Sequence, residues 1–482
     1  MMFSNLSFGL FRTLAAVTLA LTCTLAGSVR LSGAERQGRV LRVALVGDPQ
    51  VDNPVEMGYA RRSIYRDLRG RRDLDLCIFL GDLVNDNMSL LPESLNIIDS
   101  LPFQSFMVPG NHDRDVYHGS KSSGSMSRPR DLSTWRKSVG YVDTSFVRGN
   151  VRFIMMNNVR HAEAGMTDYV GGFTEKQKHW LDSVLVTDVT RGRKMSRGSV
   201  ARSRRPSLGK VTPALTILAT HIPFSQMKGR DSVLALVPEH TRMLYVSGHT
   251  HFVSRDNSIP EVIAGATCGS WWRGVKDSDG VPYALQSCGA PRGYFVAEIR
   301  RDGDYRLRYR CVGRDDEVSV WGVREEGEIG AADGRSVREQ GGDVEGDGGV
   351  YRLYVNVFGG APDGVVKVRG PRRWRIVSRG DGAHDGANAQ GFSRKKRDLV
   401  CERSAKTAPE VEQVIEFNAS MSREYRKSHR DEFIPLRRKP STHLWQTTDL
   451  ISSPLPVYVN VVYRDSHMRF RQRVPVTVTS RH

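Results

Sequence analysis

Cysteine and long apolar runs are both scarce in this chain. It has 6 cysteines in 482 residues, which excludes a small domain held together mainly by disulfides. The question of a membrane span arises only at the N-terminus, where the uncharged stretch Thr13–Val29 falls short of the roughly 20 apolar residues that a spanning helix needs. A multispan membrane protein is therefore excluded.

Acidic residues are outnumbered by basic ones. The chain has 71 Lys plus Arg against 53 Asp plus Glu, a formal charge of +18, and such a field attracts anionic partners. A hydrophobic fraction of 39% with 26% charged residues is ordinary for a globular protein and excludes wholesale disorder. The length favours two or three domains.

The N-terminus resembles a secretory signal. Arg12 precedes the uncharged stretch, and small residues follow it at Ala26, Gly27 and Ser28, so residues 1–28 are predicted to direct export to the periplasm, the cell surface or the medium. An uncleaved membrane anchor and lipidation at Cys23 are alternatives. In an oxidising compartment Cys268 and Cys288 are candidates for a disulfide, and two buried thiols are the other interpretation.

Apolar segments that each end in a polar cluster follow one another from Val40 onward. Continuous apolar runs of this kind are typical of buried parallel strands, and a helix is expected near residues 59–68 and over TEKQKHWLDSVL. The carboxyl ends of such strands meet at one edge of a sheet, where ligands bind. The predicted strands are VLRVALVGD, LDLCIFLGD, SFMVPGNHD, VRFIMMNN, ALTILATHIPF and MLYVSGHTH.

Five of these strand ends carry residues that suit a metal site. Burying so many polar groups without a partner would cost several kcal/mol each, and a cation supplies that partner. Carboxylate, amide and imidazole ligands together suit Mn, Fe, Zn or Mg. Two histidines one residue apart on an extended segment point to opposite sides, so they can serve two neighbouring ions. The candidates are Asp48, Gln50, Asp82, Asn111, His112, Asp113, His221, His249 and His251.

The order of these clusters resembles the calcineurin-like metallophosphoesterase family, whose motifs are D-x-H, GD-x-x-D or N, GNH-D/E, H and GH-x-H. The match spans about Val40–Phe252. The resemblance implies an α/β fold in four layers, a β-sandwich flanked by helices, and two divalent metal ions. It assigns one metal to Asp48, Gln50, Asp82 and His251, and the other to Asp82, Asn111, His221 and His249.

The same resemblance implies a role for His112 beside the scissile phosphate, as proton donor to the leaving group or stabiliser of transition-state charge. Two positions depart from the motifs. Gln50 stands where the first motif usually has His, which predicts a weaker first metal site with a preference for Mn or Mg. Either Asn85 or Asp86 in GDLVND could orient His112.

After Tyr294 the pattern changes to short alternating strands separated by Gly-rich loops. This predicts a phosphoesterase domain over residues 38–312 and an all-β, sandwich-like C-terminal domain over 313–482. Loops 325–349 and 380–390 have the composition of disorder. The segment from Gly265 together with the tail resembles the C-terminal half of exported bacterial phosphoesterases with an extra domain. Trp271, Trp272 and Tyr294 either form an aromatic wall beside the metals or pack the domain junction.

Residues Arg191–Lys210 form a basic run of eight Lys or Arg without an acidic residue. It is either a solvated loop or a binding segment for anionic lipid, glycan or nucleic acid.

The expected activity is metal-dependent hydrolysis of a phosphomonoester, phosphodiester or pyrophosphate by a hydroxide held between two ions. The substrate class is a phosphorylated small molecule, nucleotide, sugar or lipid, and no obligate protein partner is evident. The alternative is an exported basic polyanion-binding protein whose metal centre has degenerated at Gln50.

Overall fold

The computed structural model of the chain describes residues 40–115, 131–161, 169–186, 189–190, 210–325, 349–371, 374–377 and 398–479. The chain divides into the units Met1–Val40 and Leu41–His482, and almost all described residues belong to the second. The predicted signal, most of the basic run Arg191–Lys210 and most of the two Gly-rich loops lie outside the described residues. No helix in the described ranges is long and apolar enough to cross a membrane.

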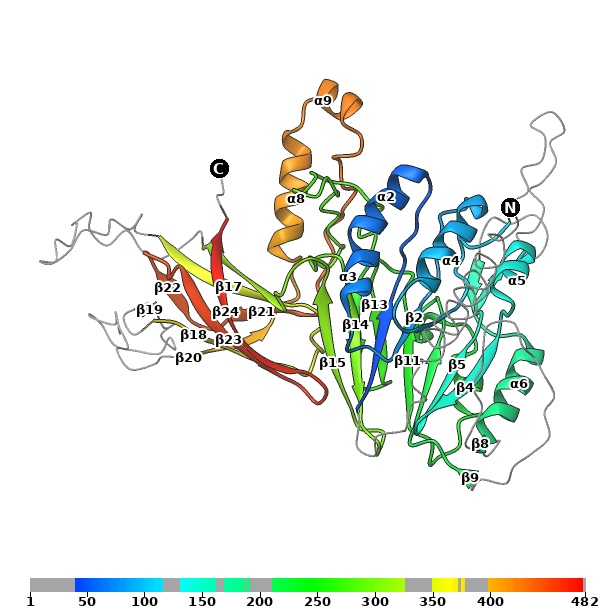
Figure 1. The fold of residues 1–482 in the computed structure, drawn as a ribbon. Coiled ribbons are helices and arrows are strands. Elements are labelled where there is room, and N and C mark those ends of the chain that lie inside the picture. The colour runs from blue at the N-terminus through cyan, green and yellow to red at the C-terminus, as the bar shows by residue number, and fades with distance from the viewer. Residues whose placement is uncertain are drawn as a thin grey trace, which may run out of the picture. The chain divides into compact units, whose positions relative to one another are not determined.

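Two mixed sheets carry the strand-end clusters (Figure 1). The first has the order β15-β14-β1-β2-β3, with β1 Leu41–Val46, β2 Leu76–Phe79, β3 Gln104–Met107, β14 Gly293–Ile299 and β15 Tyr305–Cys311. The second has the order β12-β13-β11-β10-β5-β4, with β4 Thr144–Arg148, β5 Val151–Met155, β10 Leu215–Ala219, β11 Met243–Ser247, β12 Val253–Asp256 and β13 Glu261–Ala264. All six predicted strands of this region are confirmed.

Alternate residues of each strand enter different cores, which explains the continuous apolar runs. In β1, Val43 and Leu45 belong to the core between the two sheets, whereas Ala44 and Val46 belong to a core under helices. Successive side chains of a strand point to opposite faces, so each sheet is buried on both sides. The predicted arrangement of helices, sheet, sheet and helices is confirmed.

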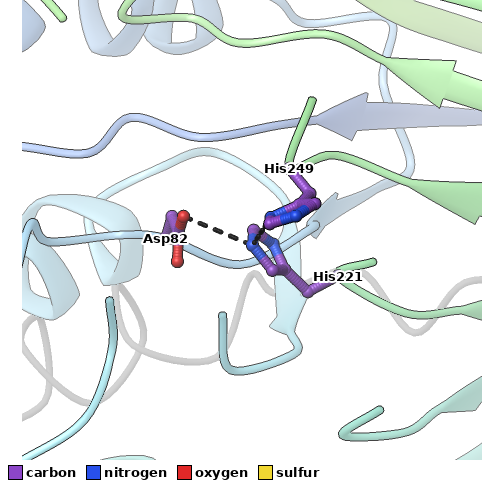
Figure 2. Close-up of side chains that lie close together, drawn as sticks. All are labelled: Asp82, His221 and His249. Atoms are coloured by element: carbon purple, nitrogen blue, oxygen red, sulfur yellow. Dashed lines mark hydrogen bonds and ion pairs between the residues drawn. The ribbon is translucent and has the colours of Figure 1, made fainter. Parts of the chain in front are cut away.

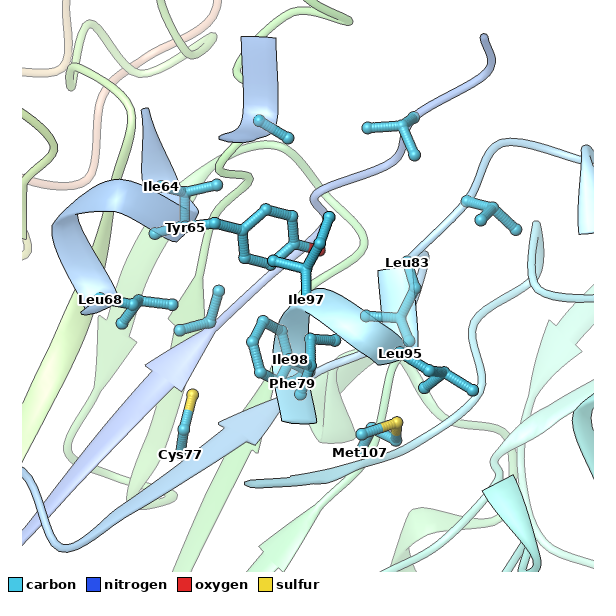
Figure 3. Packing of buried hydrophobic residues seen from close by; sticks show 14 of the residues in the cluster. Ile64, Tyr65, Leu68, Cys77, Phe79, Leu83, Leu95, Ile97, Ile98 and Met107 are labelled. Carbon is cyan, nitrogen blue, oxygen red and sulfur yellow. The ribbon is translucent and has the colours of Figure 1, made fainter. Parts of the chain in front are cut away.

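Helices α2 Pro54–Arg62, α3 Ile64–Gly70, α4 Leu91–Asp99 and α5 Ser133–Val139 contribute to the core on the first sheet. Figure 3 shows part of this packing, where Tyr65, Phe79 and Ile98 pack in the same cluster. Helices α6 Glu175–Val186 and α7 Arg230–Leu234 cover the second sheet. The helix predicted near residues 59–68 is two helices that meet at Ser63, and the one over TEKQKHWLDSVL is confirmed.

Local sequence explains where these helices begin. Asn53 accepts hydrogen bonds from the backbone N–H groups of Val55 and Glu56 and caps α2, as short polar side chains do. Thr174 and Gln177 bond each other reciprocally before α6, which is a capping box.

The C-terminal sheet has the order β16-β24-β23-β18-β20-β21-β17-β22-β19, and β16 also pairs with β17. That extra pairing closes seven strands into a ring, so the predicted sandwich-like domain takes the form of a barrel. The last strand of the first sheet ends at Cys311, and the first strand of the barrel begins at Val318. The barrel strands are β16 Val318–Arg324, β17 Val350–Val357, β18 Val365–Arg369, β19 Arg375–Val377, β20 Asp398–Arg403, β21 Leu444–Thr447, β22 Leu450–Ser452, β23 Tyr458–Arg464 and β24 Arg469–Val478.

Two helices interrupt this β-rich region and were not predicted from the sequence. They are α8 Pro409–Ser420 and α9 Arg423–Ser428, drawn in orange in Figure 1.

The disulfide considered for Cys268 and Cys288 does not form. Both are free and fully buried, and they lie in different cores, Cys268 under the helices and Cys288 between the sheets. The interpretation as buried thiols is the one that this structure supports.

A buried ion pair links β12 to the barrel. The guanidinium of Arg255 lies 2.7 Å from the carboxylate of Asp465, and both side chains are almost fully buried, at 1% and 0% exposure. Tyr463 donates a hydrogen bond to the same carboxylate. Burial opposes ionisation of Asp465, but Arg255 and Tyr463 hold the pKa of Asp465 below its ordinary value.

Removing the anion should therefore destabilise the fold strongly. We expect Asp465→Ala to lower stability by about 3–5 kcal/mol, because it leaves an uncompensated buried guanidinium. The exposed pair Arg369–Asp398 provides the control, and Asp398→Ala should cost less than about 1 kcal/mol. Urea unfolding followed by tryptophan fluorescence compares the two, and equal shifts in midpoint would contradict the assigned role of the buried pair.

Candidate metal centre

The predicted site residues converge where the strands of both sheets end. Asp48, Gln50, Asp82, Asn111, His221 and His251 are all buried, and His249 is partly exposed. Backbone strain is concentrated here, as is common at functional sites. Nine described residues other than glycine have positive φ, and all but Ala284 are candidate site residues: Asp48, Gln50, Asp82, Asp86, His249, His251, Trp271 and Trp272.

The second predicted ligand set is the tighter of the two (Figure 2). The Nε2 atom of His221 lies 2.9 Å from Oδ1 of Asn111 and 3.3 Å from Oδ2 of Asp82. It also lies 3.1 Å from Nδ1 of His249. Asp82, His221 and His249 each offer a ligand atom within 4.8 Å of the others.

A hydrogen bond at Nδ1 of His221 determines that Nε2 is the ring atom that faces this cluster. Its Nδ1 lies 2.8 Å from the carbonyl of Leu80, so a neutral ring carries its proton there and turns the Nε2 lone pair toward the other acceptors. The oxygens of Asp82 and Asn111 lie around this lone pair and repel it unless a cation lies among them. The donor set therefore fits a divalent metal.

The pKa shifts of the histidines also indicate that this site favours a positive charge. Burial lowers the pKa of His221, but the charge and hydrogen bond of Asp82, with help from Asp48, raise it to about 9. When no metal is bound, protonated His221 therefore supplies the positive charge. Burial and the neighbouring His221 lower the pKa of His249 to about 3, which keeps this imidazole neutral and able to bind a metal.

The first predicted set is looser. Nε2 of His251 lies 4.0 Å from Oδ1 of Asp48, and Nδ1 of His251 bonds the carbonyl of Gly269 at 2.7 Å, which directs Nε2 toward Asp48. Burial lowers the pKa of His251 to about 4. Gln50 donates from Nε2 to Oδ1 of Asn85 at 3.2 Å, so its amide oxygen is the atom left for a metal.

The prediction that GHTH is extended was wrong. His249 and His251 have φ of 71° and 49°, so the segment turns in the left-handed region and does not follow the alternation of a strand. The two rings nevertheless face different groups, His249 toward His221 and His251 toward Asp48.

Glycine is required next to two of the carboxylates. A Cβ on Gly110 would lie 2.0 Å from Oδ1 of Asp82, and one on Gly248 would lie 2.3 Å from Oδ2 of Asp48. The GN and GH pairs of the motifs therefore let the backbone approach the candidate ligands. The N–H groups of His112 and His249 use this approach and donate to Asp82 and Asp48.

Asp86 is the residue that contacts His112. Its Oδ1 lies 3.2 Å from Nδ1 of His112, whereas Asn85 bonds Gln50, so these contacts favour Asp86 over Asn85 as the orienting residue. Burial lowers the pKa of His112, but Asp86 and Asp82 outweigh it and the net shift is upward. His112 is thereby favoured in its protonated form.

Asp113 connects two of the loops without facing the cluster. Its carboxylate accepts hydrogen bonds from the N–H groups of Val84 and Gly110. Burial and the charge of Asp82 raise the pKa of Asp113 to about 6.

The aromatic residues divide between the two interpretations. Trp271 is 44% exposed, and its ring centroid lies 5.0 Å from that of His251, so it forms a wall beside the site. Trp272 is buried and donates from Nε1 to the carbonyl of Pro49. Tyr294 is fully buried and donates to Asp67, so it packs within the fold.

Sequence reasoning missed two residues beside the cluster. Tyr169, in β7 Tyr169–Gly171, packs edge-on against His249 at 5.6 Å between centroids. The Sγ of Cys268 lies 3.6 Å from Oε1 of Gln50. Tyr169 lies in a short segment without periodicity, and the sequence around Cys268 indicates only a disulfide or a buried thiol.

Comparison with known proteins identifies the family. Residues 41–253 match calcineurin-like phosphoesterase, and residues 261–418 match the C terminal of calcineurin-like phosphoesterase. The chain belongs to the calcineurin-like phosphoesterase family. A search of curated proteins found no match. The resemblance seen in the motifs is confirmed, and divalent metal ions are what this family implies.

Two solved structures are distantly similar to this phosphoesterase. One is a purple acid phosphatase from yellow lupin (Lupinus luteus) seeds, 16% identical with a TM-score of 0.34, covering 57% of this chain and 52% of that chain. The other is Haemophilus influenzae NAD nucleotidase, 11% identical with a TM-score of 0.27, covering 56% and 50%. The chain thus spans about half the length of each.

Gln50 offers a direct test of the first metal position. We expect Gln50→His to tighten metal binding about tenfold, or 1.4 kcal/mol, because imidazole is a stronger donor than a neutral amide oxygen to most of these ions. Gln50→Ala should weaken it. Calorimetric titration of metal-free protein with Mn²⁺ and Zn²⁺ measures both, and superimposable curves for all three proteins would show that Gln50 is not a ligand.

Proposed function

We propose that this protein is a metal-dependent hydrolase that cleaves a phosphoester bond with two divalent ions. Asp48, Gln50, Asp82 and His251 would hold one ion; the other would be held by Asp82, Asn111, His221 and His249. The single observation that carries the proposal is the grouping of oxygens of Asn111 and Asp82 and a ring nitrogen of His249 around Nε2 of buried His221. Family membership supports the same chemistry.

The metal ions, when bound, supply a water of lowered pKa and charge that stabilises the transition state. The chain's own residues supply position and protons. Asp82 would be a ligand common to both ions. Asp86 engages Nδ1 of His112, which leaves Nε2–H to donate a proton to the leaving group, as a general acid does.

The substrate class is proposed at the level of a phosphorylated small molecule, either monoester, diester or pyrophosphate. The +18 charge supports capture of anionic substrates. Manganese or magnesium is proposed as the preferred metal because of Gln50. Export is proposed on the basis of residues 1–28 alone.

Two buried candidate ligands, Asp82 and His221, test the activity. We expect Asp82→Ala and His221→Ala each to reduce turnover of 4-nitrophenyl phosphate and bis(4-nitrophenyl) phosphate by at least about 100-fold with Mn²⁺ present. Removing a group that holds transition-state charge has effects of this size. Circular dichroism and metal analysis check folding and loading. An inert wild type that is retained on polyanion resin in a steeply salt-dependent manner would instead support a binding protein.

Asp86 tests the role of His112 through pH. Because Asp86 helps raise the pKa of His112, the acid form persists to higher pH, and Asp86→Asn should lower that pKa. The alkaline limb of the kcat profile should then move to lower pH, with a loss of about 10- to 100-fold at alkaline pH. Asn tolerates the positive φ at this position.

Asn85→Ala is the matched comparison, since Asn85 contacts Gln50 and not His112. It should leave the alkaline limb in place. If Asn85→Ala moves the limb and Asp86→Asn does not, the assignment of the orienting residue is wrong.

A further inference from the structure

A cavity of about 630 Å³ adjoins the candidate metal centre and takes its walls from distant parts of the sequence. Residues of α2, including Tyr59, form one side, Trp271 and Trp272 form another, and Arg426 and Arg430 close it. Its size is typical of a site for a small organic ligand. Figure 1 shows α2 and the orange α8–α9 region at the same end of the molecule.

The wall nearest the metal centre is aromatic and held in a strained conformation. Trp271 is 44% exposed, has φ of 57° and lies next to the ring of His251. Trp272 anchors the wall through its bond to Pro49 and lies 6.2 Å from Tyr59 between centroids. A large aromatic side chain left exposed at positive φ beside a candidate ligand offers its face to a flat or apolar group.

The opposite wall is held in place by the segment after the family match ends. The N–H of Gly274 donates to the carbonyl of Asp431 at 2.8 Å, and a Cβ on Gly274 would lie 2.8 Å from Cδ1 of Ile434. Asn418 in α8 donates to the carbonyl of Ile434 at 2.7 Å. These contacts fix the segment that carries Arg426 and Arg430 against the Trp271–Trp272 segment.

Part of the cavity lining is basic. Arg426 and Arg430 also line a second cavity of about 550 Å³, together with Met421, Arg423 and Lys427. Within the described residues, neither Arg426 nor Arg430 forms an ion pair with a carboxylate. The lining of the first cavity includes two acidic residues, Glu56 and Asp431, and three basic ones, since Arg273 joins Arg426 and Arg430. The lining of the second cavity includes no acidic residue. Arg426 donates one hydrogen bond to the carbonyl of Ala419. Guanidinium groups without a carboxylate partner in a cavity with aromatic lining are suited to an anion.

We infer that this cavity is a specificity subsite for the part of the substrate beyond the scissile phosphate: a flat or apolar group against Trp271, followed by a second anionic group at Arg426 and Arg430. The inference rests on the proposed function and narrows its substrate class. It also assigns a role to the C-terminal region, which completes the site with residues that no metal motif includes.

A matched pair of substrates tests the inference. The probes are 2-naphthyl phosphate and 6-sulfonato-2-naphthyl phosphate, which differ only in a remote negative charge. We expect Arg426→Gln/Arg430→Gln to raise KM for the sulfonated probe at least about tenfold with kcat unchanged, and to change KM for the plain probe less than twofold. Arg426→Lys/Arg430→Lys should retain most of the preference, because it keeps the charge.

The control is Arg437→Gln/Lys439→Gln, which removes two charges from exposed positions of the same segment outside both cavities and should change neither KM. An equal rise in KM for both probes, or none for the sulfonated probe, would overturn the subsite.

A binding measurement separates this inference from the proposed function. Quenching of tryptophan fluorescence by the two corresponding naphthyl phosphonates, which cannot be hydrolysed, gives affinities without turnover. If the wild type hydrolyses neither probe, nor 4-nitrophenyl phosphate, nor bis(4-nitrophenyl) phosphate, the proposed function fails. In that case the subsite is still supported if the wild type binds the sulfonated phosphonate more tightly than the plain one and Arg426→Gln/Arg430→Gln does not. It is contradicted if the wild type binds both equally or if the variant keeps the difference.

Discussion

The crowding of acceptor atoms at the ends of five strands is the constraint on which the rest of this structure depends. Asp48, Asp82 and Asn111 are buried with imidazole lone pairs turned toward them, an arrangement that is unfavourable without a cation. The fold maintains it at a cost in backbone strain, which is why the left-handed residues are gathered here. Two sheets buried on both faces supply the rigidity that holds such loops in place.

The sequence was most informative where one physical rule acted alone. The strands of the two sheets have continuous apolar runs because both faces are covered, so their existence and ends were predictable. Convergence of Asp48, Asp82 and His221 followed from those ends. The geometry of His249 and His251 did not, because hydrogen bonds from the backbone to Asp48 and from His251 to Gly269 override the alternation expected of an extended segment.

The C-terminal region was harder to predict because its signals are weak or long-range. Closure of the barrel depends on pairing between β16 and β17, which the sequence separates by a long Gly-rich loop. Helix α8 begins with Pro409 and has only a short apolar stripe, Val411, Val414 and Ile415, whose packing with Leu285 depends on a distant part of the sequence. From the sequence alone, Arg426 and Arg430 are indistinguishable from surface charges. Their place beside Trp271 depends on contacts of Gly274 and Asn418 with the segment that carries them.

The two departures from the family motifs, Gln50 and the Asn85–Asp86 pair, are linked by a hydrogen bond between Gln50 and Asn85. An amide at position 50 brings an N–H₂ group that must find an acceptor when buried, and Oδ1 of Asn85 supplies it. That bond orients the amide so that its oxygen remains for a metal. Because Asn85 is engaged with Gln50, the neighbouring Asp86 takes the contact with His112 through its own positive φ of 60°. Gln50 and His112 therefore find their partners, Asn85 and Asp86, in adjacent residues of a single loop.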